Sequence, residues 1–139
     1  MVGRLPHSTR GGAYDLVSLA DVGVGVSQTL PVLVALHTAR RGQLVYLEQP
    51  EIHLHPRAQV AMGEVLADAA KRGVRVIAET HSSLLLLGIQ KRVAEGYLSP
   101  AEVKLHWFRR NDRGATSVSS HDMDETGDRS LWGMASGLR

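Results

Sequence analysis

The sequence predicts an α/β fold in which a helix joins two parallel strands. One apolar run covers residues 44–47, and a second starts at Val74 and leads into Glu-Thr-His-Ser at 79–82. Both have the length and the branched side chains of buried strands. Residues 56–72 lie between them, starting with a proline and ending just before Gly73, which is typical of a helix. This order is a βαβ unit, whose crossover is right-handed in nearly all known proteins, so the strands run parallel.

Polar residues stand where each of the two strands ends. Glu48 and Gln49 follow the first run directly, and His81 follows the second. Parallel neighbours end at the same sheet edge, about 4.8 Å apart. Open α/β sheets bind their ligands at this carboxyl edge. We therefore expect these side chains to come within reach of one ligand.

A further helix is predicted before the first strand, over residues 27–41. Ser27 can serve as its N-cap, and Pro31 lies near the first turn. Arg40 and Arg41 suit the negative end of the helix dipole, and the glycine that follows them stops the helix.

The remaining elements follow from caps and turn residues. A third helix is predicted over residues 82–95, with Ser82 or Ser83 as its cap and Gly96 as its stop. After Pro100 the pattern changes to period two, which indicates a β-hairpin. The strands of this hairpin are expected at 103–108 and 115–120 with a turn at 111–114, while 1–12 read as a loop, 13–20 as a short strand and 122–139 as a polar tail.

Composition excludes several classes of protein. The chain has 139 residues, 43% of them hydrophobic, which is typical of one globular domain. It has no cysteine, so disulfides and cysteine-based metal sites are excluded. No apolar stretch reaches the ~20 residues that cross a bilayer, and we expect a cytoplasmic protein without membrane contact.

The charge gives little support for a nucleic-acid partner. The formal net charge is only +2, and the densest basic cluster is Arg109, Arg110 and Arg113. An ordinary solvated turn is the favoured interpretation of this cluster, and DNA contact is the alternative.

Three motifs in order resemble those of ABC-type ATPases, most closely the OLD, RecF and SMC-like group. Leu44-Val-Tyr-Leu-Glu-Gln-Pro-Glu-Ile-His-Leu-His-Pro56 resembles the Walker B strand with its D-loop, and Glu79-Thr-His-Ser82 the switch-histidine segment. Upstream, Asp21 to Leu33 resembles the ABC signature, with residues 24–28 over the family's L-S-G-G-Q. The resemblance implies an AAA-type ATP-binding domain with a partial P-loop NTPase sheet and flanking helices over residues 1–98. The C-terminal β-hairpin and tail then occupy residues 99–139.

The phosphate-binding loop of that family is missing from this sequence. No G-x-x-x-x-G-K-[ST] occurs, and Gly11-Gly12 has no lysine after it. In the family this loop lies N-terminal to the signature. The resemblance therefore implies the C-terminal half of an ATPase head, which binds ATP and Mg²⁺ only when a P-loop-bearing lobe or a second ATPase head completes it. A homo-oligomer is a further expected partner, and a non-catalytic interaction module or truncated remnant is the alternative function.

The resemblance gives the residues after the first strand catalytic roles. Glu48 occupies the position whose carboxylate holds Mg²⁺, an ion that prefers oxygen ligands; the alternative is a solvated carboxylate. Gln49 stands where most of these ATPases have a glutamate. A glutamine can orient water but cannot take its proton, so slow hydrolysis is expected. Glu51 is the fallback base, because on an extended backbone it would face the same way as Gln49.

The histidines have two interpretations. His81 resembles the switch histidine that donates a hydrogen bond to the γ-phosphate, whereas a lone histidine is usually structural. Residues 52–55, with His53 and His55, resemble the D-loop, so His55 is a nucleotide-binding candidate. Zinc binding by these two histidines with Glu51 nearby is the less favoured alternative.

The signature-like residues Gly25, Ser27 and Gln28 are the remaining nucleotide-binding candidates. They are expected just ahead of the 27–41 helix, where free amides and the helix dipole attract anions. The family's serine position is Gly25 here, and one of its glycines has become Ser27. The alternative is a glycine-rich loop that leads into a buried helix.

Overall fold

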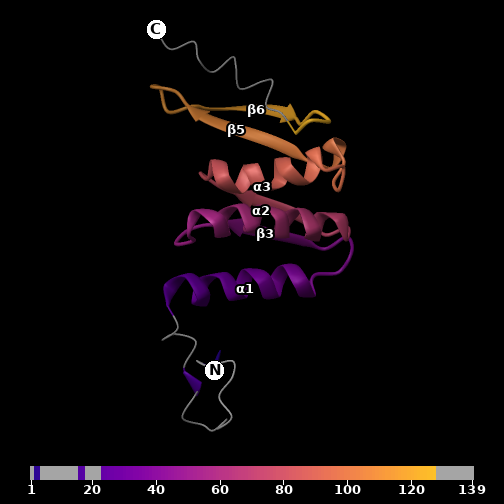
Figure 1. Cartoon of the computed structure of the whole chain (residues 1–139). Coiled ribbons are helices and arrows are strands. Elements are labelled where there is room, and N and C mark those ends of the chain that lie inside the picture. Colours follow the sequence, from indigo (N-terminus) through magenta and orange to yellow (C-terminus); the bar gives the residue numbers. More distant parts are fainter. Residues whose placement is uncertain (1, 4–15, 18–22, 128–139) are drawn as a thin grey trace.

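The computed structural model describes residues 2–3, 16–17 and 23–127, and it confirms the α/β class (Figure 1). A small parallel sheet, flanking helices and a C-terminal antiparallel hairpin follow one another along the molecule. The elements are β1 (Val2–Gly3), β2 (Leu16–Val17), α1 (Val24–Thr38), β3 (Leu44–Glu48), α2 (Pro56–Lys71), β4 (Arg75–Glu79), α3 (Ser83–Ala94), the 3-10 helix η3 (Pro100–Glu102), β5 (Lys104–Arg110) and β6 (Thr116–Asp122).

The predicted βαβ unit is present as β3, α2 and β4. The two strands pair in parallel from Leu44 opposite Arg75 to Glu48 opposite Glu79. Alternate residues of both strands pack inward against the helices. The core around them consists of Leu36, Leu47, Met62, Leu66, Ala69, Val74 and Leu85, with Val45, Val76 and Ala78 packed against it.

The other face of this two-stranded sheet is open to solvent among the described residues. Leu44, Tyr46 and Ile77 are 56%, 59% and 52% exposed. These residues alternate with buried and half-buried ones along each strand, so one face is covered and the other is not. The outward face carries large apolar side chains and ends in two carboxylates.

Ser82 fixes the start of α3 against α2. Its hydroxyl oxygen accepts hydrogen bonds from the amides of Leu84 (3.2 Å) and Leu85 (3.1 Å), which confirms the predicted cap. The same hydroxyl donates to the side-chain oxygen of Gln59 in α2 at 2.7 Å. The segment between β4 and α3 is therefore held to the neighbouring helix.

Helix α1 differs from its prediction at both ends. It begins at Val24, three residues before Ser27, and ends at Thr38. The Ser27 hydroxyl donates to the carbonyls of Gly23 (3.2 Å) and Val24 (3.0 Å), so it does not cap the helix. Pro31 consequently lies inside the helix and not in its first turn.

The residue that caps the C-terminus of α2, and not a local arginine, satisfies the carbonyls at the end of α1. The Arg72 guanidinium donates to the Leu36 carbonyl at 2.6 Å and to the His37 carbonyl at 3.4 Å. A cation at this end also complements the helix dipole. Arg40 and Arg41, expected in the last turn, lie beyond the helix.

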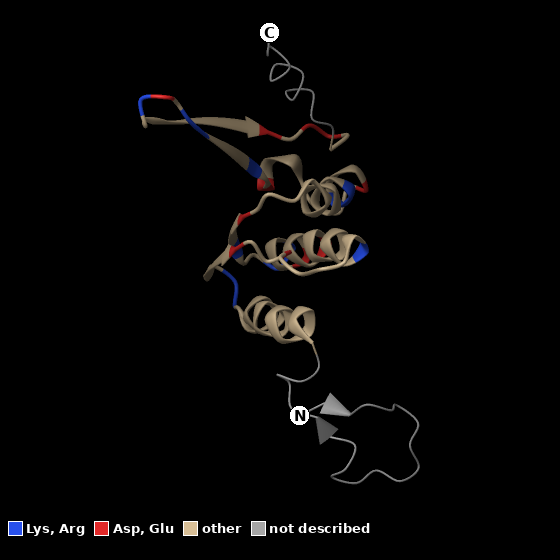
Figure 2. Ribbon diagram, turned by 90° about the vertical axis from the view of Figure 1, so that its left-hand side faces the viewer, with Lys and Arg blue, Asp and Glu red and all other residues tan. Residues whose placement is uncertain are grey.

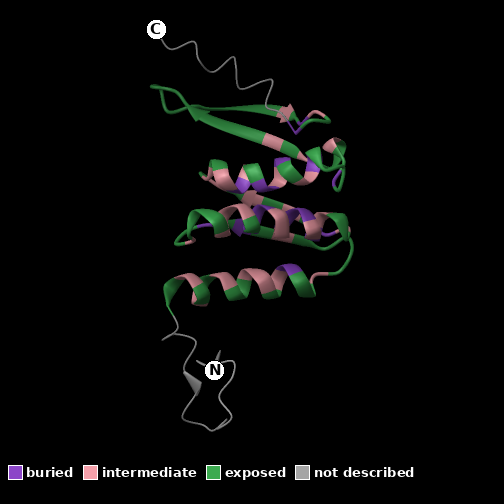
Figure 3. Ribbon diagram, in the orientation of Figure 1, coloured by how far each residue is buried: buried purple, intermediate pink, exposed green. Residues whose placement is uncertain are grey.

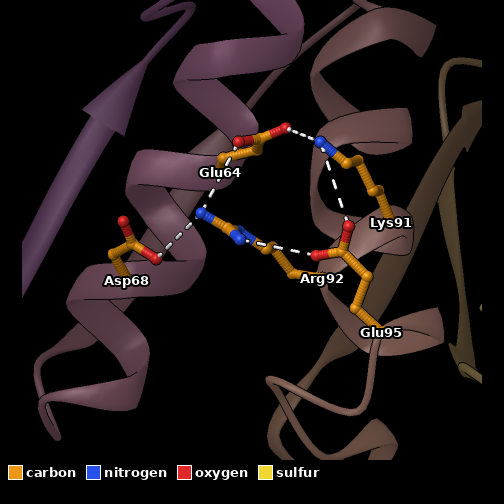
Figure 4. Close-up of polar contacts among 5 residues, drawn as sticks. All are labelled: Glu64, Asp68, Lys91, Arg92 and Glu95. Carbon is orange, nitrogen blue, oxygen red and sulfur yellow. Dashed lines mark hydrogen bonds and ion pairs between the residues drawn. The ribbon is translucent and has the colours of Figure 1, made fainter.

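Ion pairs link α2 and α3 along their exposed side (Figure 4). Lys91 contacts Glu64 at 2.7 Å, and Arg92 contacts Glu64 at 3.5 Å and Asp68 at 3.6 Å. Glu95, the C-cap residue of α3, adds contacts to both cations. The network therefore crosses between the helices at several points.

The predicted hairpin is present and longer than expected. β5 and β6 pair antiparallel from Lys104 opposite Asp122 to Arg110 opposite Thr116, with a turn at 111–114. Its base packs on the helices through a second core of Ala67, Val93, Leu98 and Met123, which Leu105 and Val103 join. Met123, expected in a polar tail, is therefore part of the core.

Some predictions fall largely outside the described residues. Val2–Gly3 pairs antiparallel with Leu16–Val17, so residues 2–3 are a strand and not part of a loop, and residues 16–17 agree with the expected strand. The rest of the 1–12 loop, of the 13–20 strand and of the tail beyond residue 127 lies outside the described residues.

In the part that the structure describes, no helix has the length and apolar character to span a bilayer.

Candidate functional site

The carboxyl edge of the β3–β4 sheet brings together the ends of both strands, as predicted. Glu48 lies beside Glu79 in the register, and the Gln49 amide donates to the Glu79 carbonyl at 2.8 Å. Glu48 is exposed and Gln49 is half-buried. His81 follows two residues after Glu79, so it lies at the same edge.

Glu79 belongs to this edge although no role was predicted for it. Its carboxylate accepts a hydrogen bond from the Tyr46 hydroxyl at 3.3 Å. Desolvation, followed by the charges of Glu79 and Glu48, raises the pKa of the Tyr46 hydroxyl. Both carboxylates therefore raise the pKa of the same phenol, which shows that negative charge is concentrated at this edge. The sequence carried a signal for this pair, because Glu48 and Glu79 each follow directly after an apolar run.

The chain turns sharply after Gln49. This residue has φ 44°, in the left-handed region that non-glycine residues seldom adopt. The Ile52 amide donates to the Gln49 carbonyl at 3.0 Å and closes the turn. Pro50 and Glu51 inside it are buried.

Glu51 faces inward as a result, and the expectation that it faces the same way as Gln49 is wrong, because the backbone between them is a turn and not extended. Glu51 is only 7% exposed. Its Oε1 accepts hydrogen bonds from the Thr80 hydroxyl at 2.6 Å and from the His81 amide at 3.2 Å. Glu51 thus ties the loop after β3 to the loop after β4. Its other oxygen, Oε2, is buried and has no hydrogen-bond partner among the described residues.

His81 is positioned through its backbone while its side chain stays exposed. The Glu51 carboxylate holds the amide of His81, and the Ser82 cap follows immediately. A ring held in this way can reach a ligand at the edge without rearrangement of the backbone. Thr80, whose hydroxyl also accepts from the Ser82 amide at 3.0 Å, completes this support and was not predicted.

The D-loop-like segment places its two histidines on the surface. His55 is the N-cap of α2, and its Nδ1 accepts a long hydrogen bond from the Arg57 amide at 3.4 Å. His53 has φ 65° and is exposed. Within the described ranges no three His, Cys, Asp or Glu residues are grouped so as to hold a metal ion. Because Glu51 is engaged with Thr80, the zinc alternative lacks its third ligand there.

The signature-like residues lie in the first two turns of α1, and not ahead of the helix as expected. The first helical hydrogen bond runs from the Ser27 amide to the Gly23 carbonyl at 3.1 Å, so the amide of Gly25 precedes the helical ladder. A Cβ on Gly25 would lie 3.3 Å from the His53 carbonyl oxygen. The start of α1 therefore lies against the D-loop-like segment. Gln28 is exposed on the next turn.

The edge fits Mg²⁺ better than it fits a whole nucleotide. Glu48 offers an exposed carboxylate beside Glu79, which are the oxygen ligands that Mg²⁺ prefers. The chain has no glycine-rich loop with a lysine to hold a triphosphate. A hollow of about 510 Å³ lies at the opposite, amino end of β3, where Ala35, Thr38, Ala39, Gln43, Leu44 and Val45 line it. It is remote from the carboxyl edge and adds nothing to this site.

A comparison with protein families matches residues 9–87, more than half of the chain, to the family described as "AAA domain, putative AbiEii toxin, Type IV TA system". The chain belongs to this AAA domain family. The match establishes a P-loop ATPase-like domain, and the matched range of the AAA domain includes every residue of the carboxyl edge described above. No curated protein and no solved structure matches the chain. The β5–β6 hairpin lies beyond the matched part of the AAA domain.

Proposed function

We propose that this chain supplies the signature, Walker B and switch-histidine half of an ATPase head of the OLD, RecF and SMC-like group. ATP and Mg²⁺ bind productively when a P-loop-bearing lobe or a second ATPase head completes the site. The observation that carries the proposal is the convergence of Glu48, Glu79 and His81 at one edge of a parallel strand pair in an AAA domain.

Each residue at the edge has a distinct role in the proposal. The exposed Glu48 carboxylate would hold Mg²⁺, which when bound neutralises phosphate charge. Gln49 would orient the attacking water through its amide, because it cannot accept a proton. His81 would donate a hydrogen bond to the terminal phosphate from a backbone that Glu51 fixes.

The signature segment and the D-loop-like segment would act together toward a second head. Gly25 at the start of α1 lies so close to the His53 carbonyl that a Cβ on it would be 3.3 Å away, so both segments lie side by side. The Gly25 amide offers a hydrogen bond to an anion at the positive end of the helix dipole. Ser27, Gln28 and His55 are the further nucleotide-binding candidates of this surface.

Uncovered apolar surface supports a completing partner. Val26, Leu30 and Val34 form a stripe on α1 and are 47%, 40% and 51% exposed. Among the described residues, the outward face of the β3–β4 sheet is uncovered as well. Large exposed apolar patches generally mark interaction sites. Docking of a P-loop-bearing lobe would cover such surface, and self-association into a homo-oligomer is the competing use.

A non-catalytic interaction module is the second candidate. It is favoured by Gln49, which replaces an acid, and by the absence of a phosphate-binding loop from the sequence. In either case the chain by itself should bind ATP no more tightly than about millimolar, near −4 kcal/mol. Isothermal calorimetry on the purified chain tests this value, and micromolar affinity would contradict it.

The decisive test is a completed protein, in which a P-loop-bearing lobe of the same family is joined to or co-expressed with the chain. Mg²⁺-dependent phosphate release is then measured. We expect Glu48→Gln and His81→Ala to abolish turnover. Arg40→Gln is the matched control, because Arg40 is exposed in the turn before the amino end of β3. Equal turnover in Glu48→Gln and Arg40→Gln would overturn the role proposed for Glu48, and no turnover in the completed parent protein would favour the non-catalytic module.

A further inference from the structure

The outer part of the β5–β6 hairpin is a two-stranded ribbon with both faces open. Leu105 near its base packs against the second core, but every residue from His106 to Ser120 is exposed. The ribbon is almost uniformly exposed in Figure 3, and its turn projects beyond the helices in Figures 1 and 2. It therefore buries little surface of its own and presents much of its length to solvent.

The end of this ribbon carries unneutralised positive charge. Arg109, Arg110 and Arg113 gather there, and Asp112 is the one acid between residues 106 and 120 (Figure 2). Within the described residues none of these three arginines forms an ion pair with a carboxylate. At the base, by contrast, Asp122 pairs with Lys104 at 2.8 Å. The charge at the tip is thus available to an anionic ligand.

Exposed aromatic rings stand beside the arginines. Phe108 is 67% exposed opposite Val118, and Trp107 is 49% exposed. Because side chains alternate along a strand, Phe108 shares one face with Arg110, and Trp107 shares the other with Arg109. Each face therefore offers a ring next to a guanidinium group. The pairing of β5 with β6 fixes where these rings lie along the ribbon. It does not account for large aromatic side chains being left exposed to solvent.

We propose that the hairpin binds single-stranded nucleic acid. Bases would stack on the exposed Phe108 ring, while Arg109 and Arg110 contact the phosphates. A duplex or an acidic peptide would engage the arginines, but it would leave the ring without an unpaired base to stack on. This inference is independent of the ATPase proposal, because the ribbon lies outside the β3–β4 edge.

Fluorescence anisotropy of the full chain with labelled oligo-dT, longer than the about 4–16 nucleotides that one OB fold covers, tests the proposal. We expect Phe108→Ala to weaken binding by about 5- to 150-fold, the range of one stacked base. Phe108→Trp, which keeps an aromatic ring at this position, should bind about as tightly as the parent chain. We expect Arg109→Glu/Arg110→Glu to lower the slope of log affinity against log salt by about 1.4, from about 0.7 per phosphate contact.

Arg40→Glu/Arg57→Glu is the matched control, because it changes the net charge by the same amount at two exposed arginines outside the ribbon. This variant should keep most of the affinity. No binding of the parent chain at low salt would overturn the proposal. So would an unchanged affinity in Phe108→Ala, tighter binding of duplex, stronger binding of a polyglutamate peptide, or an equal loss in the control. Circular dichroism confirms that each variant is folded.

Discussion

Gly63 of α2 and Gly88 of α3 face each other where the two helices cross. A Cβ placed on either glycine would lie 3.1 Å from the Cα of the other. Each would also overlap a backbone carbonyl, that of Leu85 for Gly63 and that of Val60 for Gly88. The helices therefore touch backbone to backbone, and this contact fixes how closely α3 packs on α2.

We predict that Gly63→Ala lowers stability although alanine favours helices. The added methyl forces the helices apart, and overpacking typically costs about 1–3 kcal/mol. This exceeds the helix-propensity gain of at most about 1 kcal/mol. Thermal denaturation should show a lower Tm. Ala61→Ser at an exposed neighbouring position is the control, with a change within about 0.5 kcal/mol. A Tm at or above the parent value would contradict the close contact.

Glu51 should contribute to stability more than to chemistry. We predict that Glu51→Ala destabilises the chain by about 1–3 kcal/mol, since it leaves the Thr80 hydroxyl and the His81 amide without their acceptor. Chemical denaturation measures this loss, and a double-mutant cycle with Thr80→Val should give a coupling of at least about 0.5 kcal/mol. Glu48→Ala, at an exposed carboxylate, is the control. Equal stability of the two alanine variants would refute the structural role.

Replacing Gln49 by glutamate should raise ATP turnover in the completed protein. A carboxylate can both orient and polarise water, and general-base help is typically worth about 10²–10⁴-fold. Phosphate release under saturating ATP is the measurement. If Gln49→Glu leaves turnover unchanged while Glu51→Gln abolishes it without loss of stability, Glu51 is the working base and the role of position 49 is wrong.

The ion pairs of Figure 4 should make stability depend on pH in the acid range. The hydrogen bond from Lys91, opposed by desolvation and aided by the charges of Lys91 and Arg92, lowers the pKa of Glu64 below its ordinary 4.5. A lowered native pKa means that the contribution is complete above 4.5 and is lost as the pH falls from there through the lowered value. Urea midpoints of the parent and of Glu64→Gln should therefore converge in that window. Glu125→Gln, at an exposed carboxylate outside the network, should follow the parent; a constant gap between parent and Glu64→Gln would contradict the linkage.

The isolated chain should self-associate through its α1 stripe. Leu30→Lys introduces a charge into the stripe, so we expect it to raise the monomer fraction in sedimentation velocity. Leu87→Lys makes the same change at a 48% exposed position of α3 and should have little effect. A stable monomer of the parent at high concentration would show that the exposed stripe does not drive association.

Local signals predicted most of the secondary structure. Proline and basic residues bounded α2, Ser82 capped α3, and the turn at 111–114 defined the hairpin. The start of α1 was missed because a glycine-rich segment gives no capping signal, and Ser27 bonds backward into the helix. Whether a serine caps a helix or lies inside it depends on tertiary contacts, which the local sequence does not specify.

Contacts between distant residues account for what the sequence could not predict in the site. The bond from Thr80 to Glu51 spans 29 positions and exists because Gln49 adopts a positive φ. The sheet register placed Glu79 beside Glu48, which the shared position of both glutamates after an apolar run could have indicated. The positions of the strand ends could therefore be predicted. The inward direction of the Glu51 side chain could not, because it depends on the turn after Gln49.

The open two-stranded sheet has a consequence for how this chain would persist in solution. A strand pair covered on one side has little stability of its own. A partner that binds only the folded form adds a stabilisation that grows with its free concentration relative to its Kd. The melting temperature of this chain should consequently report on the abundance of the proposed P-loop-bearing lobe. The fraction of folded chain and the fraction of assembled complex would then both be set by the binding equilibrium with the proposed lobe.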